Sequence, residues 1–566
     1  MSGQGLTRFM LCNSIWILFA LLFYADHFFF GLYIKGDGEF HHDVAMEFAK
    51  SLQSGIYYPG WSSGSFGGLG SPVFLVYAPA FHYVFALINA LIENSWLSLA
   101  LIEAISSYCV CVVVYLSLRA VRVSSPVSLI ASLLAGYYPF LYMNVLYVQG
   151  LPWHFAYIPM ALVIAGLMQP LKSFLRLALL LGIGTFFVAV THVLSAFMLL
   201  LCLPFAILPY IVAWNRLVPA QRKQVIAMAL TASASVVAGL MMAMFYLWPA
   251  ITLIEFTNET GYAGDVDWQA GFALPLFTEI RWFIYQWGMG ALLLFTLLTG
   301  TVFAFLKWRE PLTADWFALV SLLSVGWAAL FFSSELSYPL WVYSEQLRKV
   351  QYAYRFFCIA YLAAVPALAL VIYRLPSSAQ RLGLKRLSVG TIATLAIATL
   401  GLSVAVALKH HFIDGKPLEN YVNADRVADA RAFLPRSAGT HWQQYHKSGG
   451  FPARCEQNQA TCQEMSLSPE ARKWRVTSSH RWIAQLPLFS APFWDIAVGE
   501  IPITSSPDPQ TGVISIELLP GVSDIVATWE TPRERKIGAW ISLLGVVVFC
   551  LLLWRIRYYA SRNRIG

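Results

Sequence analysis

The chemically most reactive segment of this sequence follows directly after its first long apolar stretch. Lys35-Gly36-Asp37-Gly38-Glu39-Phe40-His41-His42-Asp43 holds three acids and two histidines within the seven residues from 37 to 43. Carboxylates and imidazoles are the side chains that most often transfer protons in active sites, and they also bind metal ions. This segment is therefore a candidate catalytic loop at the edge of a membrane.

Two structural explanations of the same residues remain open. Asp37 has a residue type that caps helices, and His41, His42 and Asp43 could form a solvated helix face. We assign no metal ligand here, because the adjacent His41 and His42 point about 100° apart on a helix and cannot easily share one ion.

The residues that follow must position this segment. Phe40, Val44, Phe48 and Leu52 recur every four residues, which predicts a short amphipathic helix that ends at Gly55. The opposite face carries charged residues, so the helix is expected to lie in the plane of the membrane interface.

A loop rich in glycine comes next along the chain. It comprises Tyr57-Tyr58-Pro59-Gly60-Trp61 and the run Gly64–Gly70. Because glycine adopts backbone conformations closed to other residues, this density predicts a tightly turned loop able to approach a ligand.

Composition defines the class of protein. The chain has 566 residues, of which 58% are hydrophobic and 12% charged, and its mean hydropathy is +0.61. These values exclude a disordered chain, a secreted disulfide scaffold and a plain cytosolic enzyme, and they predict a polytopic membrane protein. The net charge of +8 is better explained by basic cytoplasmic loops than by nucleic acid, so no nucleic-acid partner is expected.

Apolar stretches of about 20 residues predict twelve membrane-spanning helices. With 73–93 taken as a partly embedded interfacial helix, the loops rich in Lys and Arg all fall on the side of the N-terminus. Both termini are then cytoplasmic. The predicted spans lie near 9–33, 96–118, 126–147, 153–169, 174–191, 193–213, 225–248, 288–306, 315–333, 355–373, 387–408 and 537–554.

Several polar residues lie within or near these spans, where ionisable groups are costly and usually functional. The clearest are Asp26, His82, Glu103, Asn144 and His192. We expect Glu103 and His82 to pair within the helix bundle.

Three regions are expected. Residues 1–408 form a transmembrane core with an outer-loop active site at 34–95, residues 409–536 an extracytoplasmic β-rich domain, and residues 537–566 the last span and a basic cytoplasmic tail. Alternation over Gly512–Leu518 predicts a half-buried strand, and the domain is expected to be a sandwich. Cys455 and Cys462 lie close together in this polar region, which suits a disulfide.

The order of these features resembles the GT-C superfamily of membrane glycosyltransferases. More narrowly, it is similar to the bacterial membrane proteins called "6-pyruvoyl-tetrahydropterin synthase-related" and to proteins of the YfhO type. Thr191-His192-Val193-Leu194-Ser195-Ala196 resembles a family turn between two spans. Gln351-Tyr352-Ala353-Tyr354-Arg355 resembles a Gln-Phe-Pro-Trp-Arg signature, with Ala353 and Tyr354 departing from it. The end of the polar domain resembles the β domain of YfhO-type proteins.

The resemblance implies transfer of a sugar from a polyprenyl-phosphate donor to an envelope glycan or lipid on the outer face of a bacterial plasma membrane. In that family the base is an acidic residue of the first outer loop. Asp37 matches it best, and His41 and Asp43 are the next catalytic candidates. The residues expected to bind substrate are Glu39, His42, Tyr58, Trp61, His192, Gln351 and Arg355.

Physical chemistry adds a reason for Arg355. The leaving group is a lipid phosphate whose developing charge needs a cation, and arginine can bind phosphate with two hydrogen bonds. A divalent cation, Mg²⁺ or Mn²⁺, stays open as a cofactor. Two other functions also stay open: a flippase for lipid-linked sugars, and a non-catalytic factor in polysaccharide assembly.

Overall fold

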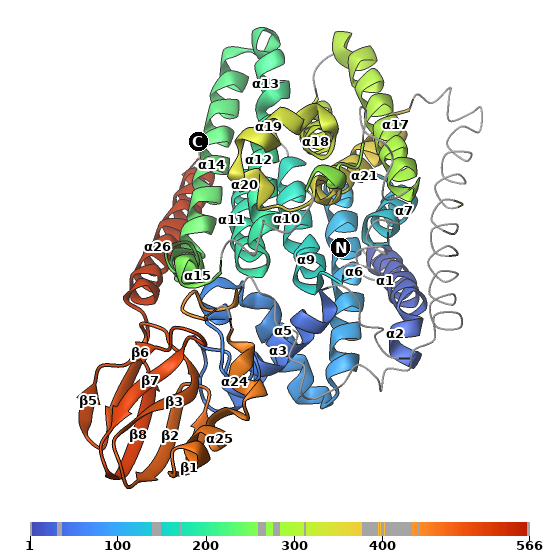
Figure 1. The fold of residues 1–566 in the computed structure, drawn as a ribbon. Coiled ribbons are helices and arrows are strands. Elements are labelled where there is room, and N and C mark those ends of the chain that lie inside the picture. The colour runs from blue at the N-terminus through green and yellow to red at the C-terminus, as the bar shows by residue number, and fades with distance from the viewer. Residues whose placement is uncertain are drawn as a thin grey trace.

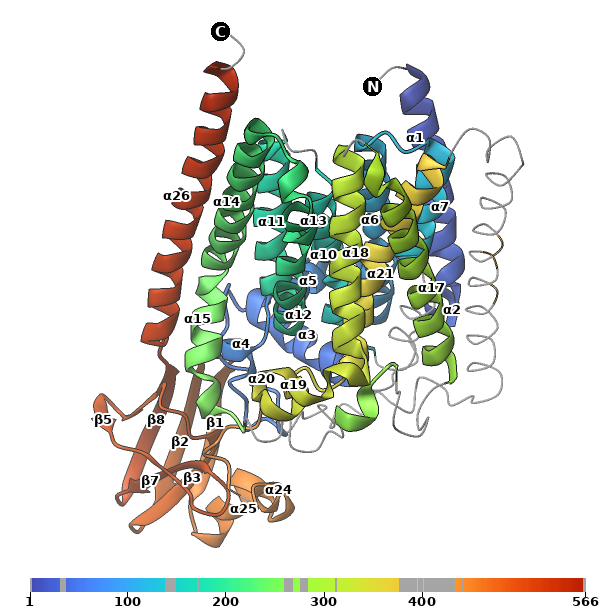
Figure 2. The same ribbon diagram turned by 90° about the horizontal axis from the view of Figure 1, so that it is seen from above.

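The chain forms a bundle of long helices with a β domain attached at one end (Figure 1). The computed structural model describes residues 3–30, 37–137, 149–169, 173–258, 268–274, 284–310, 313–375, 433–439 and 441–562, together with Thr394, Ile397 and Gly401. The N- and C-termini lie at the end of the bundle opposite the β domain (Figure 2).

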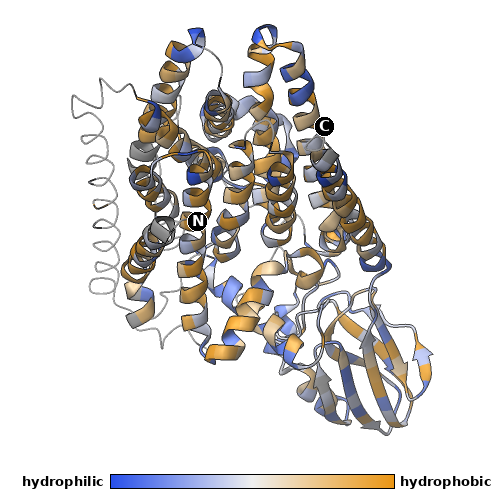
Figure 3. Cartoon of the chain, turned by 180° about the vertical axis from the view of Figure 1, so that it is seen from behind, coloured by the Kyte–Doolittle hydropathy of each residue, from blue (hydrophilic) through white to orange (hydrophobic). Residues whose placement is uncertain are grey.

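Within these described ranges, eight helices are long and apolar enough to cross a membrane. Hydrophobic residues cover most of the helical core (Figure 3). The helices that build the core are α1 (Gly3–Phe23), α2 (Ala25–Phe30), α6 (Ser95–Ala120), α7 (Ser125–Gly136), α9 (Leu151–Phe155), α10 (Tyr157–Leu167), α11 (Phe174–Thr191), α12 (Val193–Cys202), η2 (Leu203–Ile207), α13 (Leu208–Val212), α14 (Pro219–Met242), α15 (Met244–Thr252), α17 (Ile284–Leu306), α18 (Ala314–Ser333), α21 (Phe357–Arg374) and α26 (Arg533–Arg562).

Most of the predicted spans coincide with these helices. The span predicted at 387–408 lies outside the described residues apart from three positions, and so does the end of the span at 126–147. The region 73–93 forms two short helices, α4 (Val73–Val76) and α5 (Ala80–Ile92). Because α5 has 13 residues, it is shorter than the roughly 20 that a bilayer crossing needs.

Helix α21 lies at the centre of the bundle and packs against α7, α17 and α18. Nearly all of its residues are buried, as expected of a helix that is apolar on every side. A short 3-10 turn, η8 (Ala353–Phe356), leads into α21 at the end nearer the β domain. The core therefore fixes the start of α21 rigidly.

The β domain consists of two antiparallel sheets packed face to face, with strand orders β1-β2-β8-β4-β5 and β3-β7-β6. Large apolar side chains from both sheets, such as Trp474, Ile516 and Ile525, share one core. The strands are β1 (Thr461–Ser468), β2 (Ala471–Ser478), β3 (Trp482–Phe489), β4 (Trp494–Val498), β5 (Ile501–Ile503), β6 (Ser506–Pro507), β7 (Val513–Leu518) and β8 (Gly521–Trp529). Helices α24 (Gln443–Lys447) and α25 (Gly450–Gln457) precede them.

The helical core and the sandwich confirm the predicted fold class, a multi-pass helical membrane protein with a β-rich domain near its C-terminus. The expected disulfide between Cys455 and Cys462 is also present, with the Cα atoms 6.1 Å apart. It joins α25 to β1, so it closes the edge of the domain.

The predicted amphipathic helix is α3 (Gly38–Gln53), which ends two residues before Gly55. It lies between the helical core and the β domain (Figure 2). Its apolar residues Val44 and Phe48 belong to the same buried cluster as the interior of the sandwich. Helix α3, which packs on α5, α6 and α9, therefore shares a buried apolar cluster with the β domain.

Candidate active site

Asp37 occupies the residue position before α3 without capping the helix. Its side chain accepts no capping hydrogen bond, and its backbone is already helical, with φ −83° and ψ −2°. The side chain is accessible to solvent, yet protein surrounds it closely enough that desolvation raises its pKa, while the Arg355 guanidinium acts in the opposite direction. The capping explanation of Asp37 is therefore not supported, and the carboxylate is available for chemistry.

Arg355 lies in η8 and is only 6% exposed. One Nη atom donates to the Val350 carbonyl oxygen at 3.0 Å, and the guanidinium lies over the rings of Trp153 and Tyr352 at 5.4 and 5.6 Å. Its Nε has no hydrogen-bond partner. Within the described part of the chain, no carboxylate lies within salt-bridge distance of Arg355, so this buried cation retains capacity to bind an anion.

His192 joins α11 to α12, and its hydrogen bonds determine its tautomer. The backbone N–H of Ser195 donates to His192 Nδ1 at 3.2 Å, and the Ser195 hydroxyl lies 2.8 Å from the same atom. A ring nitrogen that accepts from a backbone N–H carries no proton. Burial holds the pKa of His192 well below its usual value, and Arg355 and His41 lower it further. The neutral ring therefore carries its proton on Nε2, as a hydrogen-bond donor.

His41 is the buried histidine of α3. Desolvation, assisted by the charge of Arg355, lowers its pKa to about 3. Its Nδ1 lies 3.4 Å from the hydroxyl of Tyr77. His41 is therefore a neutral hydrogen-bonding group at working pH, and a proton-accepting role would have to overcome this low basicity.

Asp37, His41, His192 and Arg355 thus come together from three separated parts of the chain. The electrostatic influence of Arg355 reaches the other three residues. Trp153 of α9 connects them, since its ring stacks on His192 at 6.5 Å and lies under Arg355. Four of the ten residues proposed from the sequence are therefore neighbours.

Two glutamines with positive φ flank this group. Gln351 has φ +70° and Gln149 has φ +50°, a backbone region that residues other than Gly, Asn and Asp rarely adopt. Gln149 lies against Gly38, where a Cβ atom would stand 2.0 Å from the glutamine Oε1. A larger residue at position 38, directly after Asp37, would therefore force the Gln149 side chain to move.

His42 and Asp43 face away from this group. His42 Nδ1 lies 2.9 Å from Asp43 Oδ1, and His42 Nε2 lies 3.0 Å from the Ser95 hydroxyl. The His42 ring also stacks on Trp96 at 4.2 Å. These contacts join α3 to the start of α6. Glu39 is half-buried on α3.

Trp61 lies against the β domain, and Tyr58 lies against α15 and the start of α26. Trp61 is fully buried between Trp494 and Trp529. The guanidinium of Arg535, at the start of α26, lies 4.0 Å from the centre of the Tyr58 ring and donates to the Tyr58, Pro59 and Phe74 carbonyl oxygens. Both aromatic residues therefore hold the loop in place in this conformation.

The glycine-rich loop approaches the β domain. Arg472 of β2 donates to the Gly68 and Ser63 carbonyl oxygens at 2.9 and 3.0 Å, and Phe489 N donates to the Leu69 carbonyl at 2.9 Å. A Cβ atom at Gly64 would stand 2.6 Å from the Glu47 carboxylate, which accepts from Gly64 N. The expectation of close approach was correct, but the partner is the protein's own chain.

Other polar residues of the spans form structural pairs. Glu103 pairs within the bundle as expected, and its partner is His27 at 3.0 Å. His82 packs among aromatic rings and lies 3.2 Å from the Ala78 carbonyl oxygen. The Asp26 side chain and Asn144 lie outside the described part of the structure.

A metal ion would need a group of His, Cys, Asp or Glu side chains as ligands. Across the residues that the structure describes, no group of three His, Cys, Asp or Glu side chains could hold a metal ion. We therefore derive no step through a divalent cation.

Sequence reasoning missed Trp153 and Gln149. Both lie in the turn before and within α9, where a Gly-Leu-Pro-Trp-His run interrupts the apolar pattern. The available sequence signal for these residues is the proline next to a tryptophan, Pro152-Trp153, where the predicted span 153–169 begins.

No protein-family model matches the chain, and no curated protein matches it. Among solved structures, the apo form of the Archaeoglobus fulgidus oligosaccharyltransferase is 13% identical with a TM-score of 0.45, over 79% of this chain and 58% of that one. The oligosaccharyltransferase AglB of the same archaeon, in complex with an inhibitory peptide and a dolichol-phosphate, is also 13% identical, with a TM-score of 0.42 and the same coverage. The chain thus spans less than two thirds of the length of these proteins.

Proposed function

We propose that this chain is an inverting glycosyltransferase that moves a sugar from a polyprenyl-phosphate donor to an envelope glycan or lipid. The observation that carries the proposal is the meeting of an accessible carboxylate, Asp37, with a buried arginine, Arg355, that has no acidic partner among the described residues. The sequence motifs that resemble GT-C enzymes support it independently, because they contain Arg355 and His192.

In this proposal Asp37 is the general base. Its carboxylate accepts the proton of the acceptor hydroxyl, whose oxygen attacks the anomeric carbon on the face opposite the phosphate. The bond between that carbon and the phosphate oxygen breaks, and the oxygen leaves with the electron pair. One displacement inverts the configuration. The raised pKa of Asp37 makes it a stronger base than an ordinary aspartate.

Arg355 and His192 would bind the leaving phosphate. The guanidinium supplies the positive charge and the neutral His192 supplies the Nε2 proton, so both stabilise charge that develops in the transition state. A single guanidinium suits the small charge of a monophosphate-linked donor. Gln351 is proposed to orient the sugar.

The orientation follows from the same proposal. Basic residues gather at the end of the bundle that carries both termini, for example Arg176 and Arg555, and the β domain lies at the opposite end (Figure 2). By the positive-inside tendency, we place the termini in the cytoplasm and the site with the β domain outside, at a bacterial plasma membrane.

The test compares Asp37→Asn with Asp43→Asn. Purified protein is incubated with radiolabelled polyprenyl-phosphate sugars and a membrane extract as acceptor. We expect Asp37→Asn to lower transfer by about 10²- to 10⁴-fold, and Asp43→Asn, on α3 with its carboxylate against the His42 ring, to retain most activity. Full activity of Asp37→Asn would refute the assignment of the base.

The alternative functions predict other outcomes. A flippase would move lipid-linked sugar across vesicle membranes without forming a glycosidic bond. A non-catalytic assembly factor would bind its polymer equally well in the Asp37→Asn variant. Wild-type protein that transfers none of the common polyprenyl-phosphate sugars but flips them would favour the first alternative.

A further inference from the structure

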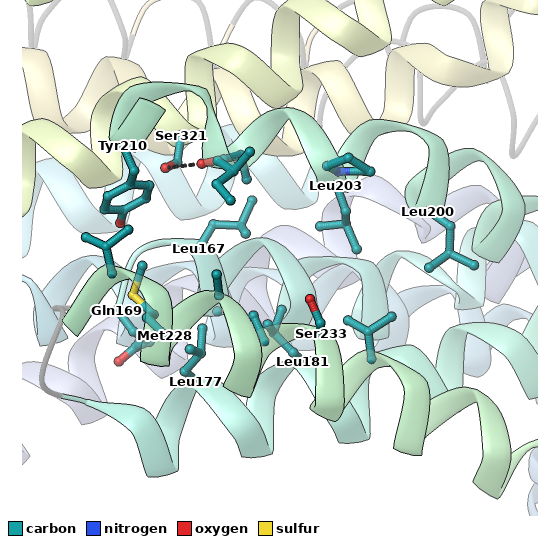
Figure 4. A pocket seen from close by; sticks show the side chains of 18 of the residues that line it. Leu167, Gln169, Leu177, Leu181, Leu200, Leu203, Tyr210, Met228, Ser233 and Ser321 are labelled. Atoms are coloured by element: carbon teal, nitrogen blue, oxygen red, sulfur yellow. Dashed lines mark hydrogen bonds between the residues drawn. The ribbon is translucent and has the colours of Figure 1, made fainter. Parts of the chain in front are cut away.

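A cavity of about 490 Å³ lies inside the helical core, away from the Asp37 site. Side chains of α10, α11, α12, η2, α13, α14 and α18 line it (Figure 4). Ile207 and Val237 are among them and are 41% and 54% exposed, so the cavity opens on the apolar outer surface of the bundle. Its volume is within the range of small-ligand pockets.

The cavity has an apolar part and a polar end. Leu200 and Leu203 lie at one end of the view, and Tyr210 and Gln169 lie at the other, with Ser321 near them (Figure 4). Ser321 donates to the Ala206 carbonyl oxygen at 2.9 Å. Its lining thus has the polarity pattern of an amphiphile.

At the polar end, Gln169 has a buried oxygen that lacks a hydrogen-bond donor. The residue is 7% exposed, and its Nε2 donates to the Ala165 carbonyl oxygen at 3.0 Å, but its Oε1 is buried without a hydrogen-bond partner. A buried acceptor left unpaired is unfavourable. Because the rest of the cavity is mainly apolar, it offers a water molecule few of the two to four partners that water needs.

We propose that this cavity binds one hydrocarbon chain of a neutral lipid whose hydroxyl or amide N–H donates to Gln169 Oε1. The chain lies along Leu200, Leu203 and the apolar residues of α14. The head group lies at the end of the bundle that carries the termini, since α10 runs from the Asp37 site towards that end. The bound lipid belongs to the leaflet opposite the active site.

The tail of a polyprenyl donor fits this cavity poorly. An isoprenoid tail ends in methyl groups and carries no hydrogen-bond donor for Gln169. The polar end also lies apart from the Asp37 site, because the 16 residues from Trp153 to Gln169 extend about 24 Å along α9 and α10 at 1.5 Å per residue. The proposal therefore stands independently of the glycosyltransferase function.

The test uses delipidated full-length protein in detergent and two probes of equal chain length, a monoacylglycerol and a fatty-acid methyl ester. Native mass spectrometry and thermal shift report binding. We expect wild-type protein to bind one monoacylglycerol and to prefer it about tenfold over the ester, which lacks a donor. Gln169→Leu should abolish this preference while still binding the chain.

A second variant fills the cavity. Ala232→Phe should abolish binding of both probes, whereas Ile226→Phe, on α14 but outside the lining, should leave binding unchanged. The proposal is overturned if Ala232→Phe binds as wild-type protein does, or if wild-type protein and Gln169→Leu show the same selectivity. Sugar transfer measured on the same variants separates this result from that of the proposed function.

Discussion

At the scale of the residue, Asp37 and Arg355 each lie in surroundings that disfavour their own charge. Asp37 lies where burial favours its neutral form, and Arg355 carries a charge that has aromatic rings and a carbonyl around it in place of a carboxylate. Such arrangements are unfavourable for stability and typical of sites that bind a charged ligand.

Asp37→Asn should make the protein more stable at neutral pH while it abolishes transfer. The folded state raises the pKa of Asp37 above 3.8, so it holds the proton more tightly than the unfolded chain does. The stability contributed by this group is complete below the unfolded pKa and is lost as pH rises through the folded pKa. Thermal unfolding at pH 7 measures the effect, and a lower Tm for Asp37→Asn would contradict it.

Variants of Arg355 should change the pH dependence of transfer. Because Arg355 lowers the pKa of Asp37, Arg355→Gln should move the acidic limb of kcat/KM to higher pH and lower kcat by about 10²- to 10³-fold. Arg355→Lys keeps the charge but loses the paired donors, so its acidic limb should stay in place while kcat falls. Identical limbs in wild type and Arg355→Gln would disprove the electrostatic coupling.

At the scale of the element, the glycine-rich loop is held by β2. Arg472, 5% exposed, donates to carbonyl oxygens of Ser63, Gly68 and Pro487. Arg472→Met leaves these acceptors buried without donors, which should destabilise the folded protein by about 2–4 kcal/mol. Chemical unfolding and protease cleavage within residues 60–70 measure this.

The matched control lies on the same strand. Arg475 pairs with Asp524, and both side chains are about half exposed, so Arg475→Met should change stability little. Equal effects of the two variants would show that Arg472 does not anchor the loop.

Elements were predicted from the sequence better than contacts between them. The four-residue repeat of α3 and the alternation of β7 show which faces are buried. They do not show what covers those faces. From the sequence, Trp61 and the glycines are predicted to bind a ligand. A backbone that closely approaches a ligand and one that closely approaches another domain need the same residue types, so the pattern does not distinguish the two.

The same reasoning explains the mixed result at the site. Asp37, His192 and Arg355 could be proposed from short motifs, but whether Asp37, His41 or Asp43 faces Arg355 depends on helix phase. Asp37 and His41 are four residues apart and share a face, and Asp43 does not. Trp153 and Gln149 belong to the site through contacts between distant parts of the chain: Trp153 lies against Arg355 and His192, and Gln149 lies against Gly38.

At the scale of the whole molecule, the site lies between two bodies that different parts of the chain build. The helical core supplies Arg355, His192 and Trp153. The segment that supplies Asp37 and His41 leads into α3, which packs on α5, α6 and α9 and shares a buried apolar cluster with the sandwich.

The proposed orientation predicts which ends of the molecule are accessible. In intact spheroplasts, a membrane-impermeant maleimide should label Thr477→Cys of the β domain, whose native residue is exposed. Ser561→Cys near the C-terminus should react only after permeabilisation. Wild-type cells report background from the native cysteines, and the reverse pattern would invert the topology.

The contacts of Arg535 have a consequence for how the protein is made. This residue begins the last helix, yet it holds the backbone of Tyr58, Pro59 and Phe74, which the ribosome synthesises 461 to 477 residues earlier. In the proposed orientation, the first loop is therefore synthesised and translocated long before the residue that holds it. A nascent chain that ends before Arg535 would contain Asp37 and Arg355 but would lack the contacts that fix Tyr58, Pro59 and Phe74, so we expect the fold to be completed only once the final span is inserted.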